Sequence, residues 1–257
     1  MTAKVKDVFH WVNDIAPFET AEKWDNSGLL MGKKDNEVTN IICALDVNER
    51  VIEEAEKLNA NTIVSHHPIM FSGRKNLRED DAEGRLLCRL VRGGYNVISA
   101  HTNYDKALGG VNDCLAQALG IDNPEKIEGD EEEIVRIGNI APVTLDEFSK
   151  NVEKALGDVV RVYGDRNKMI RRVAVCGGSG GEYAYMALRA GADAYVTGEM
   201  RYHDSIDLSW EGLSTLLAGH DATERIAIKP LANGLQNRAD ALQYNLKVFL
   251  VSMGVVE

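Results

Sequence analysis

Histidine and carboxylate residues gather at three places in the sequence where they could bind metal ions. The first is the segment 65–68 (SHHP), in which two adjacent histidines follow an apolar run. Adjacent side chains at a strand end point to opposite sides of the backbone, so His66 and His67 could each hold one of two ions. Neutral imidazole suits Zn, Fe, Ni or Cu, and oxygen ligands extend the choice to Mn and Mg. An exposed histidine pair without a ligand is the alternative.

The other two groups share the pattern of a histidine followed four positions later by a carboxylate. They are His101 with Asp105, and His220 with Glu224. A helical turn brings residues four apart to one face, and a carboxylate can bridge two cations through its two oxygens. Each group alone is more typical of an ordinary surface pair. The hypothesis of a metal site depends on all three groups following predicted strands.

Three further polar segments are candidate parts of this site. Glu199 follows another predicted strand and could act as a general base or support a metal ligand, or it could be a solvated carboxylate. The glycine-rich turn 177–181 could bind a phosphate through its backbone N–H groups, although it lacks a P-loop lysine and the GxGxxG spacing. In the polar turn 24–28 (WDNSG), Trp24 is either a structural plug or a substrate contact.

Apolar periodicity predicts strands and helices that alternate through the first half of the chain. They are a helix at 2–16, a strand at 40–46, a helix at 48–59, a strand at 62–65, a helix at 82–93, a strand at 96–100 and a helix at 111–119. Parallel strands joined by helices place their ligands at the C-terminal ends of the strands, where the histidines occur. The acidic stretch 122–133 is expected to be an exposed loop.

The second half of the sequence resembles the first. Residues 41–68 align with residues 173–200, and residues 98–105 align with residues 217–224. Each half then ends one strand with a polar pair and a later strand with the histidine-and-carboxylate pattern. Two blocks in the same order favour an internal repeat, although a generic β-α-β likeness is the alternative. The repeat predicts two related α/β halves whose strand ends face one cleft.

Composition limits the classes of function. The formal net charge is −11, which argues against nucleic acid or an anionic membrane surface as a partner. It does not exclude a small anionic substrate held through metal ions. No two of the four cysteines form a CxxC pair, and free thiols of a reduced cytosol are expected. No signal peptide or apolar run of about 18 residues is evident, so we expect a cytoplasmic protein.

Six motifs together closely resemble the Nif-three-like family, whose members are often labelled GTP cyclohydrolase I type 2 homologues. In chain order they are WDNSG (24–28), SHHP (65–68), HTNYD (101–105), GGSG (177–180), TGE (197–199) and GHDATE (219–224). Asp221 departs from the GHYATE sequence that is common in the family, which puts a stacking contact at that position in doubt.

This resemblance implies a dinuclear metal site and an assembly. The implied ligands are His66, His67, Asp105, His220 and Glu224. Glu224 would bridge the two ions, and His101 would lie close by as a conditional ligand. The resemblance also implies two interlocked α/β domains, assembled as a toroidal homohexamer with the metal sites facing its interior.

We therefore expect an α/β fold of two related, interlocked halves with the metal site in the cleft between them. The first half should span residues 1–125 together with the C-terminal segment, and the second residues 126–257. The expected function is a metal-dependent hydrolase acting on a nucleotide or another phosphorylated small molecule. Two divalent ions (Fe, Zn, Mn, Ni or Mg) would be its cofactors, with Glu199 and His101 as catalytic groups. The alternative is a non-enzymatic ring that handles metal or scaffolds partners.

Overall fold

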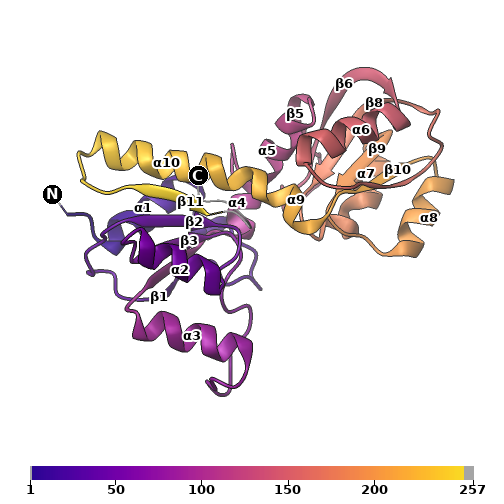
Figure 1. The fold of residues 1–257 in the computed structure, drawn as a ribbon. Helices are drawn as coiled ribbons and strands as arrows, with labels where there is room; N and C mark the ends of the chain where they lie inside the picture. Colours follow the sequence, from indigo (N-terminus) through magenta and orange to yellow (C-terminus); the bar gives the residue numbers. More distant parts are fainter. Residues whose placement is uncertain (1, 252–257) are drawn as a thin grey trace. The chain divides into compact units, whose positions relative to one another are not determined.

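The chain forms two compact α/β units in the computed structural model, which describes residues 2–251 (Figure 1). The first unit comprises residues 2–107 and 228–251, and the second comprises residues 108–227. The chain thus leaves the first unit after Ala107 and returns to it at Ile228, so that the last helix and strand complete the first unit. The predicted fold class, two related and interlocked α/β halves, is confirmed.

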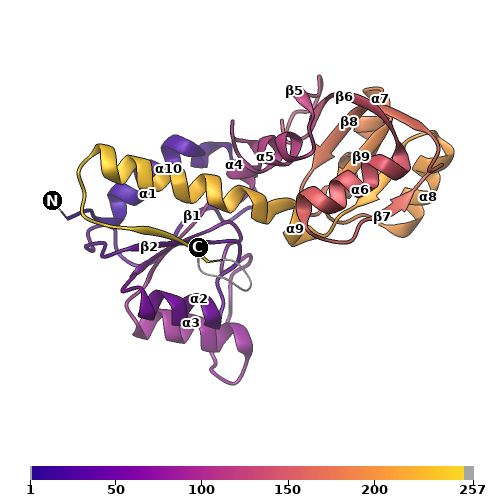
Figure 2. The same cartoon turned by 45° about the horizontal axis from the view of Figure 1, so that its top comes forward.

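The first unit is a sheet covered by helices on both faces. Its strand order is β1-β4-β3-β2-β11, with β1 antiparallel to β4 and the other pairs parallel. Helices α2 and α3 cover one face, and α1 and α10 cover the other (Figures 1 and 2). The elements are α1 (Val5–Ile15), a 3-10 turn (Phe18–Thr20), β1 (Gly28–Met31), β2 (Ile41–Ala44), α2 (Glu49–Lys57), β3 (Thr62–Ser65), α3 (Ala82–Arg92), β4 (Asn96–Ser99), α4 (Thr102–Lys106), α10 (Ile228–Ala241) and β11 (Val248–Val251).

The second unit is also a layered α/β structure. Its strand order is β5-β6-β8-β9-β10-β7, in which β8, β9 and β10 are parallel and the remaining pairs are antiparallel. The elements are α5 (Val111–Ala118), β5 (Asp122–Lys126), β6 (Arg136–Thr144), α6 (Leu145–Leu156), β7 (Arg161–Tyr163), β8 (Met169–Cys176), a 3-10 turn (Gly180–Tyr183), α7 (Ala184–Arg189), β9 (Ala194–Thr197), α8 (Tyr202–Trp210), β10 (Ser214–Leu217), α9 (His220–Glu224) and a 3-10 turn (Arg225–Ala227).

Alternate residues of the central strands build a core on each face of the second sheet. On β8, Val173 and Val175 belong to the cluster that includes residues of α5 and α6. Ala174 and Cys176 belong to the cluster that includes residues of α7 and α8. Because successive side chains of a strand point to opposite faces, an unbroken apolar run is what a sheet covered on both sides requires. The same reasoning explains the fully buried strands β2, β3 and β4.

The two sheets share a pattern that supports the internal repeat. Strands β2, β3 and β4 are parallel neighbours in one sheet, as β8, β9 and β10 are in the other. The likeness extends to a fourth strand, because β1 lies antiparallel beside β4 and β7 lies antiparallel beside β10. Gly28 of β1 is opposite Ser99, and Arg161 of β7 is opposite Leu217. Each histidine-and-carboxylate group therefore follows an equivalent strand.

Two features of the region after residue 107 differ from the sequence analysis. Residues 122–126 form the exposed strand β5, paired with β6, where we expected a loop. Five exposed polar or proline residues carry no strand pattern, which explains this error. The units also divide at 107/108, whereas the sequence placed the first division near residue 125. Helix α5 belongs to the second unit because Leu115 packs in the same core as Phe148 of α6.

Candidate metal centre

Three histidines of the first unit lie close together at the carboxyl ends of two neighbouring strands. His66 and His67 follow β3, and His101 follows β4. One ligand atom from each lies within 4.8 Å of those of the other two. Asp105, one turn further along α4, places its Oδ1 3.6 Å from Nε2 of His66. Because β3 and β4 are parallel, their carboxyl ends bring these side chains to one edge of the sheet.

Each of these histidines is held at Nδ1 by an oxygen acceptor. The acceptors of His66, His67 and His101 are, in that order, the carbonyl oxygen of Ala100 at 2.9 Å, a carboxylate oxygen of Asp46 at 2.7 Å and one of Asp25 at 2.8 Å. An acceptor at Nδ1 places the ring proton there and leaves the lone pair of the neutral imidazole on Nε2. Metal-binding histidines typically have this second contact. The donor chemistry of the group therefore fits a divalent transition metal.

Asp25 is fixed in the protein by several hydrogen bonds. It accepts them from His101 Nδ1, from the backbone and the hydroxyl of Thr102 at 3.1 and 2.6 Å, and from the hydroxyl of Ser27 at 2.7 Å. Burial acts to raise the pKa of Asp25, but the hydrogen bonds from His101, Thr102 and Ser27 outweigh it and hold the pKa well below its usual range. Asp25 is therefore charged at neutral pH and orients His101.

The second unit contains a histidine in a similar setting. His220 and Glu224 lie one turn apart on α9, with Nε2 3.2 Å from Oε1. On the other side of the ring, Nδ1 of His220 lies 3.5 Å from Oε2 of Glu199, which follows β9. Glu224 is buried and Glu199 is largely exposed. The second unit thus brings together its three predicted site residues, as the first brings together His66, His67, His101 and Asp105.

Comparisons with known proteins agree with the motifs. The family description Duf34/NIF3 (NGG1p interacting factor 3) matches residues 3–254. The chain belongs to the DUF34/NIF3 family. A Clostridium perfringens member named GTP cyclohydrolase 1 type 2 homolog is 33% identical over 246 residues, which cover 93% of each chain. A Lactococcus lactis protein of the same name is 35% identical over 221 residues, 84% of this chain and 86% of its own. The predicted family resemblance is confirmed.

Solved structures of family members share the fold. A hypothetical protein of Staphylococcus aureus is similar with a TM-score of 0.90 at 29% identity, covering 98% of this chain and 96% of its own. HcgD from Methanocaldococcus jannaschii, in its reduced form, is similar with a TM-score of 0.82 at 26% identity, covering 99% of each chain. Within residues 2–251, no helix combines the length and apolar character needed to cross a bilayer.

The glycine-rich turn of the family motif packs against the donor pair of α9. A Cβ at Gly178 would lie 2.1 Å from Oε1 of Glu224, and its φ of +59° is a conformation that glycine adopts readily. Three N–H groups of the turn are bonded within the protein. Gly177, Gly178 and Gly180 donate, respectively, to Oδ1 of Asn112 at 2.7 Å, Oγ1 of Thr223 at 2.9 Å and Oγ1 of Thr197 at 3.1 Å. These bonds argue against the phosphate-binding role considered from the sequence.

Replacing Gly178 with alanine should weaken metal binding as well as stability. The new methyl group would displace the Glu224 carboxylate, and we expect the metal affinity to fall about 10- to 100-fold, as for other changes that disturb ligand orientation. Gly191→Ala is the matched control, because Gly191 also has a positive φ (+77°) but nothing within 4 Å of the added Cβ. Metal titrations of both variants check this. Equal metal affinities in the two would contradict it.

Two exposed aromatic side chains border the histidines of the first unit. Trp24 is 64% exposed and lies edge-on to His101, with ring centroids 6.1 Å apart. Phe71 is 55% exposed, and its centroid lies 5.4 Å from that of His101. The side chain of Asn26 donates a hydrogen bond of 2.6 Å to the carbonyl of Met70, which joins the two loops. Trp24 is therefore not buried as a structural plug and offers its ring beside the donor group.

The sequence analysis missed the carboxylates that hold the histidines. Asp46 lies two residues after β2. Its place after a predicted strand could have identified it as a candidate site residue. Asp25 lies in the WDNSG turn, which we noted for its aromatic residue and its polar character. Neither contact has a local pattern, because His67 and His101 are far along the chain from their acceptors.

Proposed function

We propose that the protein is a metal-dependent hydrolase that acts on a nucleotide or another phosphorylated small molecule. One observation carries this proposal: all four histidines of the candidate centre have Nδ1 facing an oxygen, and Nε2 lies beside a carboxylate oxygen in two of them, at 3.6 Å in His66 and 3.2 Å in His220. These histidines are His66, His67, His101 and His220. That arrangement is typical of imidazoles that bind metal.

The ligands of two divalent ions would be His66, His67, Asp105, His220 and Glu224. Three imidazoles and two carboxylates suit Fe, Zn, Mn, Ni or Mg in different degrees. When bound, a pair of divalent ions lowers the pKa of a water ligand and polarises the attacked group.

Two residues beside the ligands would move protons. The Glu199 carboxylate has a side chain 61% exposed and stands 3.5 Å from His220, where it could accept the proton of the attacking water. His101, oriented by Asp25 at 2.8 Å, would serve either as a proton carrier for the leaving group or as an additional ligand. The exposure of Glu199 and the fixed orientation of His101 support these roles.

The aromatic residues favour a substrate that contains a ring. Trp24 and Phe71 present exposed faces next to His101, and aromatic side chains are common platforms for nucleic-acid bases. The names of the Clostridium and Lactococcus relatives point to GTP as the first nucleotide to examine. This supports a nucleotide over a ring-free phosphate ester as the substrate.

An activity panel tests the proposal. Protein loaded with each metal in turn should hydrolyse at least one nucleoside triphosphate, with a kcat/KM above those for ribose 5-phosphate and pyrophosphate. Glu199→Gln should lower kcat by about 10²- to 10⁴-fold, the usual contribution of a general base. Trp24→Leu should mainly raise KM for the nucleotide. Bound metal without turnover on the whole panel would contradict the hydrolase and support the metal-handling alternative.

The assembly and location of the protein are also proposals. A toroidal homohexamer would give six times the chain mass of 28.3 kDa in solution, which native mass measurements can check. We propose the cytoplasm as its compartment, since its four cysteines are free thiols. Neither the hexamer nor the compartment is needed for the chemistry described above.

A further inference from the structure

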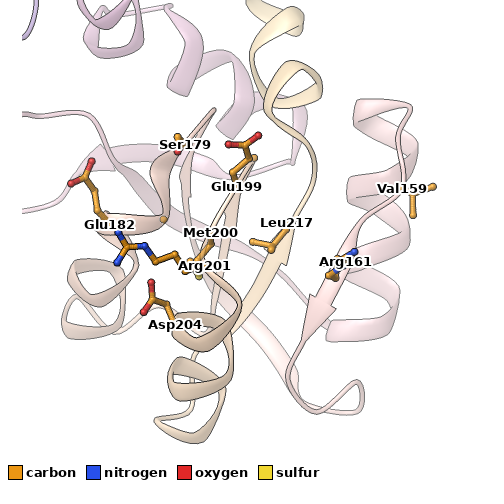
Figure 3. A pocket seen from close by; sticks show the side chains of 11 residues that line it. Val159, Arg161, Ser179, Glu182, Glu199, Met200, Arg201, Asp204 and Leu217 are labelled. Carbon is orange, nitrogen blue, oxygen red and sulfur yellow. The ribbon is translucent and has the colours of Figure 1, made fainter.

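A pocket in the second unit opens beside the His220–Glu199 pair. Its volume is about 1120 Å³, and Glu199 is one of its lining residues (Figure 3). Leu217 and Met200 add apolar surface to the lining, and Arg161 and Arg201 add positive charge. The lining thus mixes apolar side chains with acidic and basic ones, which suits a polar ligand.

The pocket lies at the edge of the sheet where α/β proteins bind ligands. Glu199 follows β9, Leu217 ends β10, and Ser179 follows β8. These three strands are parallel, so their carboxyl ends share this edge. Arg161 starts the antiparallel strand β7 directly opposite Leu217. The position of the pocket therefore follows from the strand order.

The two arginines have different surroundings. Figure 3 shows Arg201 on the same side of the pocket as Glu182 and Asp204, and Arg161 on the other side with Val159. Among residues 2–251, neither guanidinium has an ion-pair partner. The carboxylates of Glu182 and Asp204 nevertheless offset the positive charge on the Arg201 side, while the labelled lining residue beside Arg161 is the apolar Val159. An anion would be attracted most strongly to the Arg161 side.

We propose that this pocket binds the sugar phosphate part of the substrate, with the phosphate at Arg161. A guanidinium matches a phosphate through two parallel hydrogen bonds. On the opposite side, Arg201, Glu182 and Asp204 offer donors and acceptors together, which suits the hydroxyl groups of a sugar. Glu199 would then be at the reacting end of the same molecule. The inference deepens the proposed function and rests on it for the identity of the reaction.

Binding to metal-free, full-length protein tests the pocket without any turnover. We would titrate ribose 5-phosphate and ribose by calorimetry. Ribose 5-phosphate should bind, and Arg161→Gln should weaken it about 10- to 100-fold, as expected for loss of a charge-assisted bidentate contact. Arg161→Lys should recover part of this loss. Arg201→Gln should have a smaller effect, because Glu182 and Asp204 already offset its charge.

Arg171→Gln is the matched control. Arg171 is exposed on β8 of the same unit and does not line the pocket, so the change of net charge is the same. Its affinity for ribose 5-phosphate should equal that of the original protein. Equal weakening by Arg161→Gln and Arg171→Gln, or no phosphate-dependent binding at all, would contradict the proposal that this pocket binds a sugar phosphate at Arg161. Retained binding without hydrolysis would instead count only against the proposed activity.

Discussion

Replacing Glu224 with alanine is expected to reduce the bound metal from two ions per chain to one at most and to abolish hydrolysis. Glu224 is only 4% exposed, and its Oε1 lies 3.2 Å from Nε2 of His220. Under the proposed function Glu224 would contribute to the binding of both ions, so its loss should cost more than the loss of a ligand to one ion. Elemental analysis after dialysis against trace metal, followed by the nucleotide panel, measures both effects.

Two companion variants separate metal binding from folding. Glu224→Gln keeps the size of the side chain and removes the charge, so it should also lose metal while keeping the thermal stability of the metal-free protein. Glu211→Ala removes an exposed carboxylate of the same unit, just after α8, and should keep both ions. If Glu224→Ala retained two ions, Glu224 would not be a ligand.

Asp25→Ala should strongly destabilise the first unit. The Asp25 side chain is fully buried and accepts hydrogen bonds from His101, Thr102 and Ser27. Removing it leaves these donors without their acceptor in a buried site, which should lower the free energy of unfolding by about 3–5 kcal/mol. Because His101 would lose its orientation, hydrolysis should slow about 10- to 100-fold as well.

The stabilisation from Asp25 should depend on pH in a defined direction. Its pKa is lowered in the folded protein, so the carboxylate contributes its full stabilisation above the unfolded value of about 3.9. That contribution declines as the pH falls from there toward the lower folded pKa. The difference in stability between the original protein and Asp25→Ala should therefore shrink in acid.

The fluorescence of the first unit can report this effect. Trp11 and Trp24 belong to the first unit and Trp210 to the second, so a Trp210→Phe background restricts the signal to the first. Asp35→Ala is the matched control, because Asp35 is an exposed acid whose ion pairs with Lys4 and Lys6 contribute about 1 kcal/mol or less. If Asp25→Ala were as stable as Asp35→Ala, the role assigned to Asp25 would be wrong.

The residues of the candidate centre could be predicted because they follow strands with clear apolar patterns. Runs such as 62–65 and 96–100 marked strand ends, and the repeat then drew attention to His220 and Glu224. The spacing of four suits a helical turn, and the structure has one at each place: His101 precedes α4, which contains Asp105, and α9 spans His220–Glu224. Local sequence carried this information because strand, helix and spacing are local properties.

Features that depend on distant contacts could not be predicted in this way. The hydrogen bond from His101 to Asp25 joins residues 76 positions apart. Strand β5 exists only through its pairing with β6, because its own residues are all exposed. Helix α5 belongs to the second unit through its core contacts and through the ion pair between Asp113 and the buried Arg136 of β6. In each case the feature depends on the position of a contacting residue or strand elsewhere in the chain, and not on the local sequence pattern.

Most of the histidines in the chain belong to the candidate metal centre. Four of the six, His66, His67, His101 and His220, belong to the candidate centre. His10 and His203 are exposed on α1 and α8. With Asp105 in the first unit and Glu224 in the second, these four give the acidic chain metal donors in each unit. Bound cations would offset part of the formal charge of −11 beside these donors.

Metal content per chain is the most direct test of the dinuclear centre. Freshly purified protein, and metal-free protein reloaded with Fe, Zn, Mn, Ni or Mg and then dialysed, should be measured by elemental analysis beside Glu224→Ala. The predicted result is about two ions of one metal per original chain and at most one in the variant. Retention of no metal by the original chain under every condition, or equal retention by the two proteins, would contradict the account.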